Sequence, residues 1–209
     1  MKRILTAILF TLSWAFTWAD SPLTSTHFAE NYNDHPMVQM ALRLSDDSDT
    51  NIPVSLLDFL ADKKSPIDVR LAVINAIGWN FDGKTSGQQF LEYLSKRYKA
   101  KTADKLAKKL DAGTLAVYAY ALAMSNYFEV EDAKELAHNA VKKDKSKSFS
   151  VAFITSLIDA QVYLDSDWSM VYKVVNDVLH DGSLHLDMRQ EAIDKVMEYI
   201  NLYQEYDHD

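Results

Sequence analysis

The stretch SPIDVRLAVINAIGW, residues 65–79, decides the fold class, because it holds both the start signal and the buried face of an α-helix. Ser65 is a capping residue, Pro66 suits a first helical turn, and Asp68 places an acid where a helix favours one. Apolar residues then recur with helical spacing, at Val69, Ala72, Val73, Ala76 and Ile77. The stretch therefore predicts a helix with one buried face.

Similar signals predict helices along most of the chain. The expected helices span residues 36–44, 53–62, 88–99, 103–110, 115–128, 132–143, 150–163, 168–179 and 187–204. No run alternates apolar and polar residues between hairpin turns, so no strand is expected. Residues 20–33 have no period and predict an extended N-terminal arm, followed by a single helical domain at 34–209. The predicted fold is all-α, with antiparallel helical hairpins in a short solenoid-like array or an irregular bundle.

The first nineteen residues, MKRILTAILFTLSWAFTWA, have the pattern of a secretory signal peptide. Lys2 and Arg3 precede an apolar run that is too short to span a bilayer comfortably, and Thr17 and Ala19 suit a signal peptidase. We expect cleavage after Ala19 and a mature protein that is periplasmic or secreted. No later segment predicts a membrane span.

Composition narrows the class of partner. The chain of 209 residues has 22 Lys and Arg, 30 Asp and Glu, and no Cys. Loss of Lys2 and Arg3 with the signal peptide leaves 20 basic residues against 30 acidic ones, a net charge of −10. Nucleic acid and anionic membranes are therefore poor partners. Without Cys, the chain has no disulfide, thiol nucleophile or Cys-ligated metal.

The segment from Leu115 to Lys145 resembles one unit of the tetratricopeptide family. Small residues stand where that family packs its two helices closely, at Ala121, Ala133 and Ala140. Residues 150–181 resemble a second unit shifted by about 37 residues, with Met170 and Asp177 in the small positions. Residues 66–78 are similar to one helix of a HEAT-type repeat. These resemblances imply a divergent helical-repeat protein.

One segment has the oxygen ligands of a calcium loop. Residues 46–51, DDSDTN, are followed by Asp58 at the twelfth position counted from Asp47, but Ile52 stands where such a loop has Gly. Asp49 or Asn51 as a helix cap explains the segment without a metal.

A second segment, HDGSLHLD at residues 180–187, holds two His and two Asp in no established zinc spacing. Ordinary roles explain these residues: His180 at a helix C-terminus, Gly182 in a left-handed C-cap, and Asp187 as the next N-cap. We therefore expect no metal and no other cofactor.

Catalytic motifs are absent from the sequence, which contains neither G-x-S-x-G nor H-E-x-x-H. The acids Glu92, Glu129, Glu131 and Glu135 all suit exposed helix positions. We assign no catalytic residue, although a glycan hydrolase with paired carboxylates is an alternative function.

Aromatic residues point to binding. Trp79 and Phe81 lie in a connector, where large rings are either core plugs or anchors for a partner. Tyr118, Tyr120 and Tyr127 spread around their helix too widely for a single buried stripe. We expect these five residues to line a groove that binds an extended or helical peptide.

Basic residues cluster at 96–109 and again at 142–147, in an otherwise acidic protein. Lysines near helix C-termini explain both clusters, and a surface for an acidic partner is the functional alternative. The expected function is an exported, non-catalytic protein-binding module, such as an envelope scaffold or adaptor. An immunity protein that neutralises a basic toxin is a second possibility within the binding class.

Overall fold

The computed structural model describes residues 20–45, 51–100 and 102–207, and this part of the chain is all-α, as the sequence predicts. The expected signal peptide and most of the candidate calcium loop lie outside the described residues. The elements are η1 (Phe28–Tyr32), α2 (Pro36–Leu42), α3 (Val54–Ala61), α4 (Ile67–Ile77), α5 (Ser86–Tyr98), α6 (Ala103–Lys109), α7 (Ala112–Ser125), α8 (Glu131–Lys143), α9 (Phe149–Tyr163), α10 (Trp168–Leu179), α11 (Gln190–Ile200) and η2 (Asn201–Tyr206).

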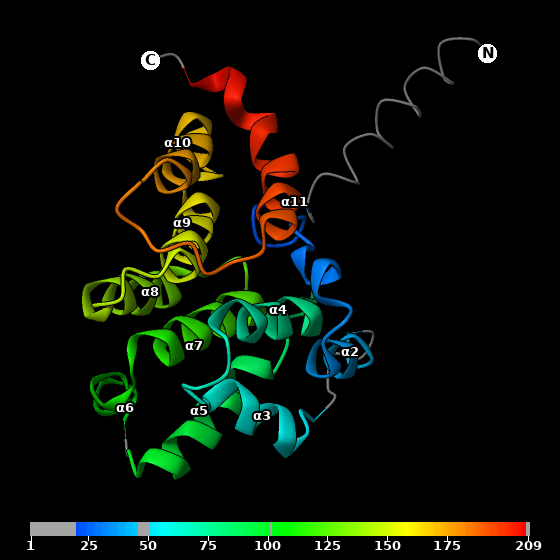
Figure 1. Cartoon of the computed structure of the whole chain (residues 1–209), viewed down its shortest axis with the longest axis vertical. Helices are drawn as coiled ribbons and strands as arrows, with labels where there is room; N and C mark the ends of the chain where they lie inside the picture. The colour runs from blue at the N-terminus through cyan, green and yellow to red at the C-terminus, as the bar shows by residue number, and fades with distance from the viewer. Residues whose placement is uncertain (1–19, 46–50, 101, 208–209) are drawn as a thin grey trace, which may run out of the picture.

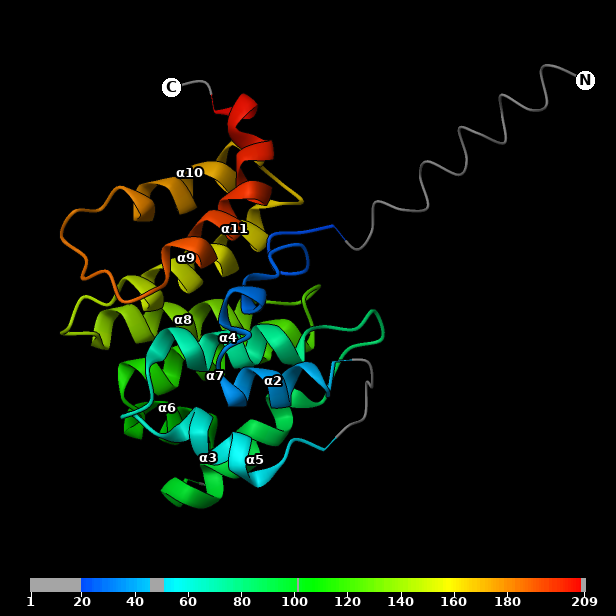
Figure 2. The same cartoon turned by 45° about the vertical axis from the view of Figure 1, so that its right-hand side comes forward.

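Helix α7 lies at the centre of the fold. Eleven of its fourteen residues are buried, and it packs against α4, α5, α8 and α9. Its sequence is apolar all round, which is typical of a helix enclosed by others. Figures 1 and 2 show α7, α8, α9 and α10 stacked in chain order along the long axis, with α3 and α5 beyond α7 at one end.

Two neighbouring helix pairs have the same spacing. The first pair is α7 and α8, which begin at residues 112 and 131, and the second pair is α9 and α10, which begin at 149 and 168. Each helix of the second pair therefore begins 37 residues after the corresponding helix of the first pair. The small residues Ala121, Ala133 and Ala140 are all buried. In α10, Asp177 is exposed and Met170 half-buried, so the helix buries Val171 and Val175 instead.

The segment at residues 20–33 is folded into the core and is not an extended arm. Leu23, Thr26 and Phe28 are buried, and η1 occupies the end of the segment. Asn75 of α4 holds it in place: its Oδ1 accepts a hydrogen bond from Ala29 N at 2.9 Å, and its Nδ2 donates to Thr26 O at 2.9 Å. This order comes from side chains distant in the sequence, which explains why the segment itself has no period.

Arg189, just before α11, joins the N-terminal segment to the C-terminal helix. Its guanidinium donates to both carboxylate oxygens of Asp34, at 2.7 and 3.0 Å, and to Asn31 O at 2.8 Å. It also lies 4.5 Å from the centre of the Tyr32 ring, and the Tyr32 hydroxyl donates to Asp68 Oδ2 at 3.0 Å. The first and last described parts of the chain therefore form one packed unit.

Arg70 is a buried cation that connects α3, α4 and α7. Its Nε and Nη2 donate to Leu60 O, the carbonyl near the end of α3, at 2.9 and 2.6 Å, and Nη2 also donates to Thr114 Oγ1 at 2.8 Å. Asp111 caps α7 by accepting from Thr114 N at 2.9 Å. Arg70 thus satisfies a helix end and fixes the N-terminus of α7 beside it.

Candidate functional site

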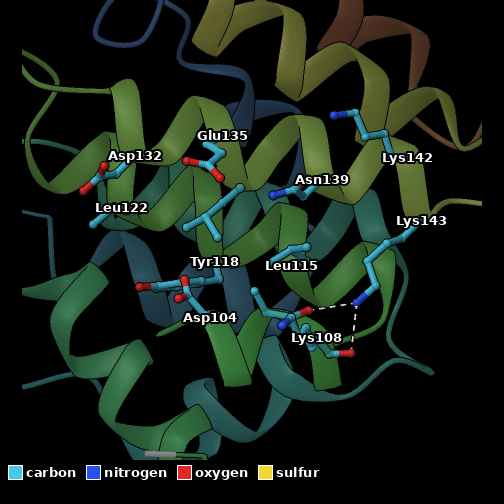
Figure 3. A pocket seen from close by; sticks show the side chains of 12 residues that line it. Asp104, Lys108, Leu115, Tyr118, Leu122, Asp132, Glu135, Asn139, Lys142 and Lys143 are labelled. Atoms are coloured by element: carbon cyan, nitrogen blue, oxygen red, sulfur yellow. Dashed lines mark hydrogen bonds between the residues drawn. The ribbon is translucent and has the colours of Figure 1, made fainter. Parts of the chain in front are cut away.

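A groove of about 570 Å³ lies between α6, α7 and α8. Its apolar lining comes from Leu115 and Leu122 of α7 and Leu136 of α8, together with the Tyr118 ring between them. Figure 3 shows Tyr118 and Leu115 along the middle of the groove and Leu122 nearer to Asp132. The volume lies in the range of sites that bind a small ligand or the anchor residues of a peptide.

Charges of opposite sign occupy the two ends of this groove. Asp104 of α6 and Asp132 and Glu135 of α8 lie at one end, which we call the acidic end. Lys108 of α6 and Lys142 of α8 lie toward the other, the basic end (Figure 3). All five side chains are exposed. The order arises because α6 and α8 each carry acids in the first turn and lysines in the last, which the helix dipole favours.

Lys143 closes the basic end and helps to shape the groove. Its Nζ donates to three carbonyl oxygens at the end of α6, those of Ala107 at 2.8 Å, Lys108 at 3.3 Å and Leu110 at 2.5 Å. The ammonium therefore ties α8 to α6 and is already engaged (Figure 3). Lys109 acts in the same way on α5, by donating to Tyr98 O at 2.7 Å. Helix-end stabilisation accounts for these two lysines.

Tyr118 forms part of the groove lining from a largely buried position. Its side chain packs edge-on against Phe90 of α5, with 6.4 Å between ring centres, and only 4% of the residue is exposed. Burial, and to a lesser extent the nearby Asp132 carboxylate, raise the pKa of its hydroxyl. The hydroxyl therefore stays neutral at physiological pH and can take part in hydrogen bonds only.

The five aromatic residues expected to line one groove do not do so. Tyr118 contributes to the groove described above, whereas Tyr120 is fully buried and its hydroxyl accepts a hydrogen bond from Asn75 Nδ2 at 2.9 Å. Tyr120 therefore cannot contact a partner. The other three residues lie at a different place, at the connectors after α4 and α7.

At those connectors, Trp79 is a structural residue. It is half-buried, its Nε1 donates to Thr24 O at 3.2 Å, and its ring packs edge-on against Tyr127 at 5.1 Å. Tyr127 is only 2% exposed. Phe81 differs, since it is 57% exposed and packs edge-on against Phe128, which is 53% exposed. Of the predicted binding residues at these connectors, Phe81 alone has a largely exposed ring.

The segment at residues 180–187 has the structure of a connector. His180 follows α10 as predicted, with its Nδ1 at 2.9 Å from Asn176 O. Gly182 is not left-handed, because among the described glycines a positive φ occurs only at Gly78 and Gly83. Asp187 does not cap α11: its Oδ1 accepts from Ser150 N at 2.8 Å, and the helix begins three residues later, at Gln190. Within the described ranges, no group of three potential metal-ligating side chains is found.

Asn51 belongs to the other candidate metal segment, and the helix after it starts without a side-chain cap. The N-cap position of α3 is Pro53, which has no side chain able to accept a hydrogen bond. Asp58 instead pairs with Arg97 of α5 at 3.1 Å. Asp46 to Thr50 lie outside the described residues.

Comparison with protein-family models, with curated proteins and with solved structures finds no match to this chain. Among the described helices, none is long and apolar enough to cross a membrane. A function is therefore inferred from the groove itself. The sequence contained one signal for the groove, the two basic clusters, but it did not indicate that Lys108 and Lys142 line the same end of it.

Proposed function

We propose that this protein is an exported, non-catalytic protein-binding module, an envelope scaffold or adaptor, that holds a segment of a partner in the groove between α6, α7 and α8. The observation that carries the proposal is the division of the groove into an apolar middle and two charged ends. Such a surface buries apolar side chains centrally and leaves charged pairs at the rim, which is the usual anatomy of a protein interface.

The exposure of the carboxylates favours binding over hydrolysis. Asp104, Asp132 and Glu135 all lie on the rim and are exposed. A carboxylic acid that protonates a leaving group near neutral pH is ordinarily desolvated in an apolar pocket. We expect the purified protein to release no soluble fragments from peptidoglycan, and release of such fragments would favour the glycan-hydrolase alternative.

The spacing of the helix pairs supports a repeat-like origin for the groove. We interpret α7–α8 and α9–α10 as two divergent tetratricopeptide-like units, because both helices of the second pair follow their counterparts by 37 residues, from 112 to 149 and from 131 to 168. Stacked helical pairs of this kind create extended binding surfaces along their length.

A photo-crosslinking residue in the groove tests the binding role directly. Asn139 is half-buried on α8 in the middle of the groove, and Asp177 is an exposed residue of α10 outside it. With the crosslinker at 139, we expect a discrete adduct with one protein in intact host cells, and with the crosslinker at 177 we expect none. Equal adducts at both positions, or none at either, would contradict the proposal.

Blocking the groove provides an independent check. Asn139→Trp fills the middle of the groove from an already partly exposed position, and Asp177→Trp is the matched control. We expect the first change to abolish the adduct formed by a second crosslinker placed at Lys142, and the second change to preserve it.

Export is tested separately from binding. Protein recovered from the envelope of the host should begin at Asp20 and dissolve without detergent, if residues 1–19 act as a signal peptide. Recovery of chains that begin at Met1 would contradict the export proposal but leave the binding proposal intact.

A further inference from the structure

The chemistry of the groove indicates the secondary structure of its occupant. A bound extended strand needs partners for its backbone groups, and the part of the chain described here contains no strand edge to supply them. The middle of the groove is apolar apart from Tyr118 and Asn139. A helix satisfies its own backbone hydrogen bonds and needs only an apolar stripe, so it fits this surface better.

The length of the groove matches a short helix. Its α8 wall extends from Asp132 to Lys143, eleven residues apart in the sequence, which corresponds to about 16 Å along a helix axis. A partner helix of about three turns covers this distance and presents apolar residues at positions i, i+3 or i+4, and i+7. Those residues would contact the half-buried Leu122 and Leu136 and the small exposed part of the Tyr118 ring, whereas Leu115 lies fully buried beneath them.

The order of charges sets the direction of that helix. The acidic end of the groove attracts basic residues, and the basic end attracts acidic ones. Most stable helices carry acids in the first turn and basic residues in the last. Such a helix meets opposite charges at both ends only if its first turn lies at the basic end, beside Lys108 and Lys142, which makes it antiparallel to α8.

We propose that the groove binds an amphipathic helix of a partner protein, antiparallel to α8, with its acidic first turn against Lys108 and Lys142 and its basic last turn against Asp104, Asp132 and Glu135. This inference rests on the proposed binding function and adds the chemistry and direction of the partner. Lys143 has no part in it, because its ammonium is bound to the end of α6.

Two synthetic peptides serve as probes. Each is about 15 residues long, with Leu at helical spacing on one face. The first, the matched peptide, has Glu in its first turn and Lys in its last, and the exchanged peptide has these charges reversed. Each peptide is titrated into the wild-type protein and into a charge-reversed protein that carries Lys108→Glu, Lys142→Glu, Asp132→Lys and Glu135→Lys. The four measurements form a cycle, in which any difference in intrinsic helicity between the peptides cancels.

We expect the wild-type protein to bind the matched peptide about tenfold more tightly than the charge-reversed protein does, since several exposed ion pairs change sign together. The exchanged peptide should show the opposite preference. Both preferences should shrink in 1 M salt, where the screening length falls to about 3 Å. A control variant, Lys63→Glu with Glu191→Lys, changes two exposed charges outside the groove and should bind both peptides as the wild type does.

Each contrary outcome has a definite meaning. If the peptides bind but show no reversal of preference, the antiparallel direction is wrong. If neither peptide binds although the crosslinker at Asn139 still captures a protein, the helical occupant is wrong and the binding function stands. If the crosslinker also captures nothing, both proposals fail. A wild-type dimer in the ultracentrifuge that Asn139→Trp abolishes would assign the groove to a second copy of this chain and overturn the inference.

Discussion

Replacement of Asn75 by Ala should release the N-terminal segment and destabilise the whole protein. The side chain is 5% exposed and makes three hydrogen bonds of 2.9 Å, to Ala29 N, Thr26 O and the Tyr120 hydroxyl. In the variant, Ala29 N–H and the buried Tyr120 hydroxyl lose their Asn75 partner, whereas Thr26 O keeps a hydrogen bond from Phe28 N at 2.9 Å. Each unpaired buried group costs about 1–3 kcal/mol, so we expect a loss of about 4 kcal/mol in the free energy of unfolding.

Urea denaturation measures this loss, and Tyr120→Phe is the control. The control removes only the hydroxyl, and Asn75 keeps both backbone partners, so we expect it to cost about 1 kcal/mol. For a domain of this size, a loss of about 4 kcal/mol corresponds to a fall of about 8–16 °C in melting temperature. Limited proteolysis should cut the Asn75→Ala variant first within residues 20–33.

The refuting result is specific. If Asn75→Ala unfolds within about 1 kcal/mol of the wild type, or is no less stable than Tyr120→Phe, the hydrogen bonds of Asn75 to Ala29 N and the Tyr120 hydroxyl are not the source of stability that we infer. Tryptophan fluorescence gives a second reading, because Trp79 contacts the same segment through Thr24 O.

Three further changes have distinct expected outcomes. Trp79→Ala should cost about 3 kcal/mol of stability and Phe81→Ala less than about 1 kcal/mol, since only the first ring is packed and hydrogen-bonded; equal melting temperatures would contradict this. Gly87→Ala should destabilise the protein, because its Cβ would lie 3.0 Å from Leu122 Cα, whereas Gly182→Ala, with nothing within 4 Å, should be neutral in the same thermal melt. Burial raises the pKa of Asp68 above 3.8, so the native state holds this proton more tightly than the unfolded state and stability falls as pH rises from 3.8 through the native pKa. The urea midpoint of the wild type should therefore fall relative to that of Asp68→Asn across this window, and parallel curves would refute the assignment.

Helices were predictable because their signals are local. The helix at Trp168–Leu179 begins and ends as the sequence indicates, with Asp167 as its cap accepting from Ser169 N at 3.1 Å. The last helix begins later than expected because Asp187 hydrogen-bonds to Ser150 across the fold instead of to its own helix. The boundary was thus set by tertiary contacts.

The candidate site was only partly accessible to sequence reasoning. Tyr118 and Tyr120 lie on different faces of α7, and the sequence interpretation takes aromatic residues on several faces as a sign of a groove. In the structure, they lie on different faces because α7 is enclosed by other helices on nearly all sides. The groove depends on how far α6 stands from α8, a distance that no local pattern encodes. Helices α6 and α8 each carry acids in the first turn and lysines in the last, and the two helices run in the same direction. Their acids therefore line one end of the groove and their lysines the other.

The contacts of Arg189 with Asn31 and Asp34 have a consequence for the time at which the fold can close. Asn31 and Asp34 precede Arg189 by 158 and 155 residues in the sequence. At synthesis rates of about 5–20 residues per second, roughly 8–30 seconds therefore pass between the synthesis of these partners and that of Arg189. During that interval Asn75 is available to hold Thr26 and Ala29, but Asn31 and Asp34 lack their Arg189 partner. For a protein that is exported as proposed, we expect this delay to favour translocation of an incompletely folded chain, because the contacts between the two ends form only after the residue before its last helix has emerged.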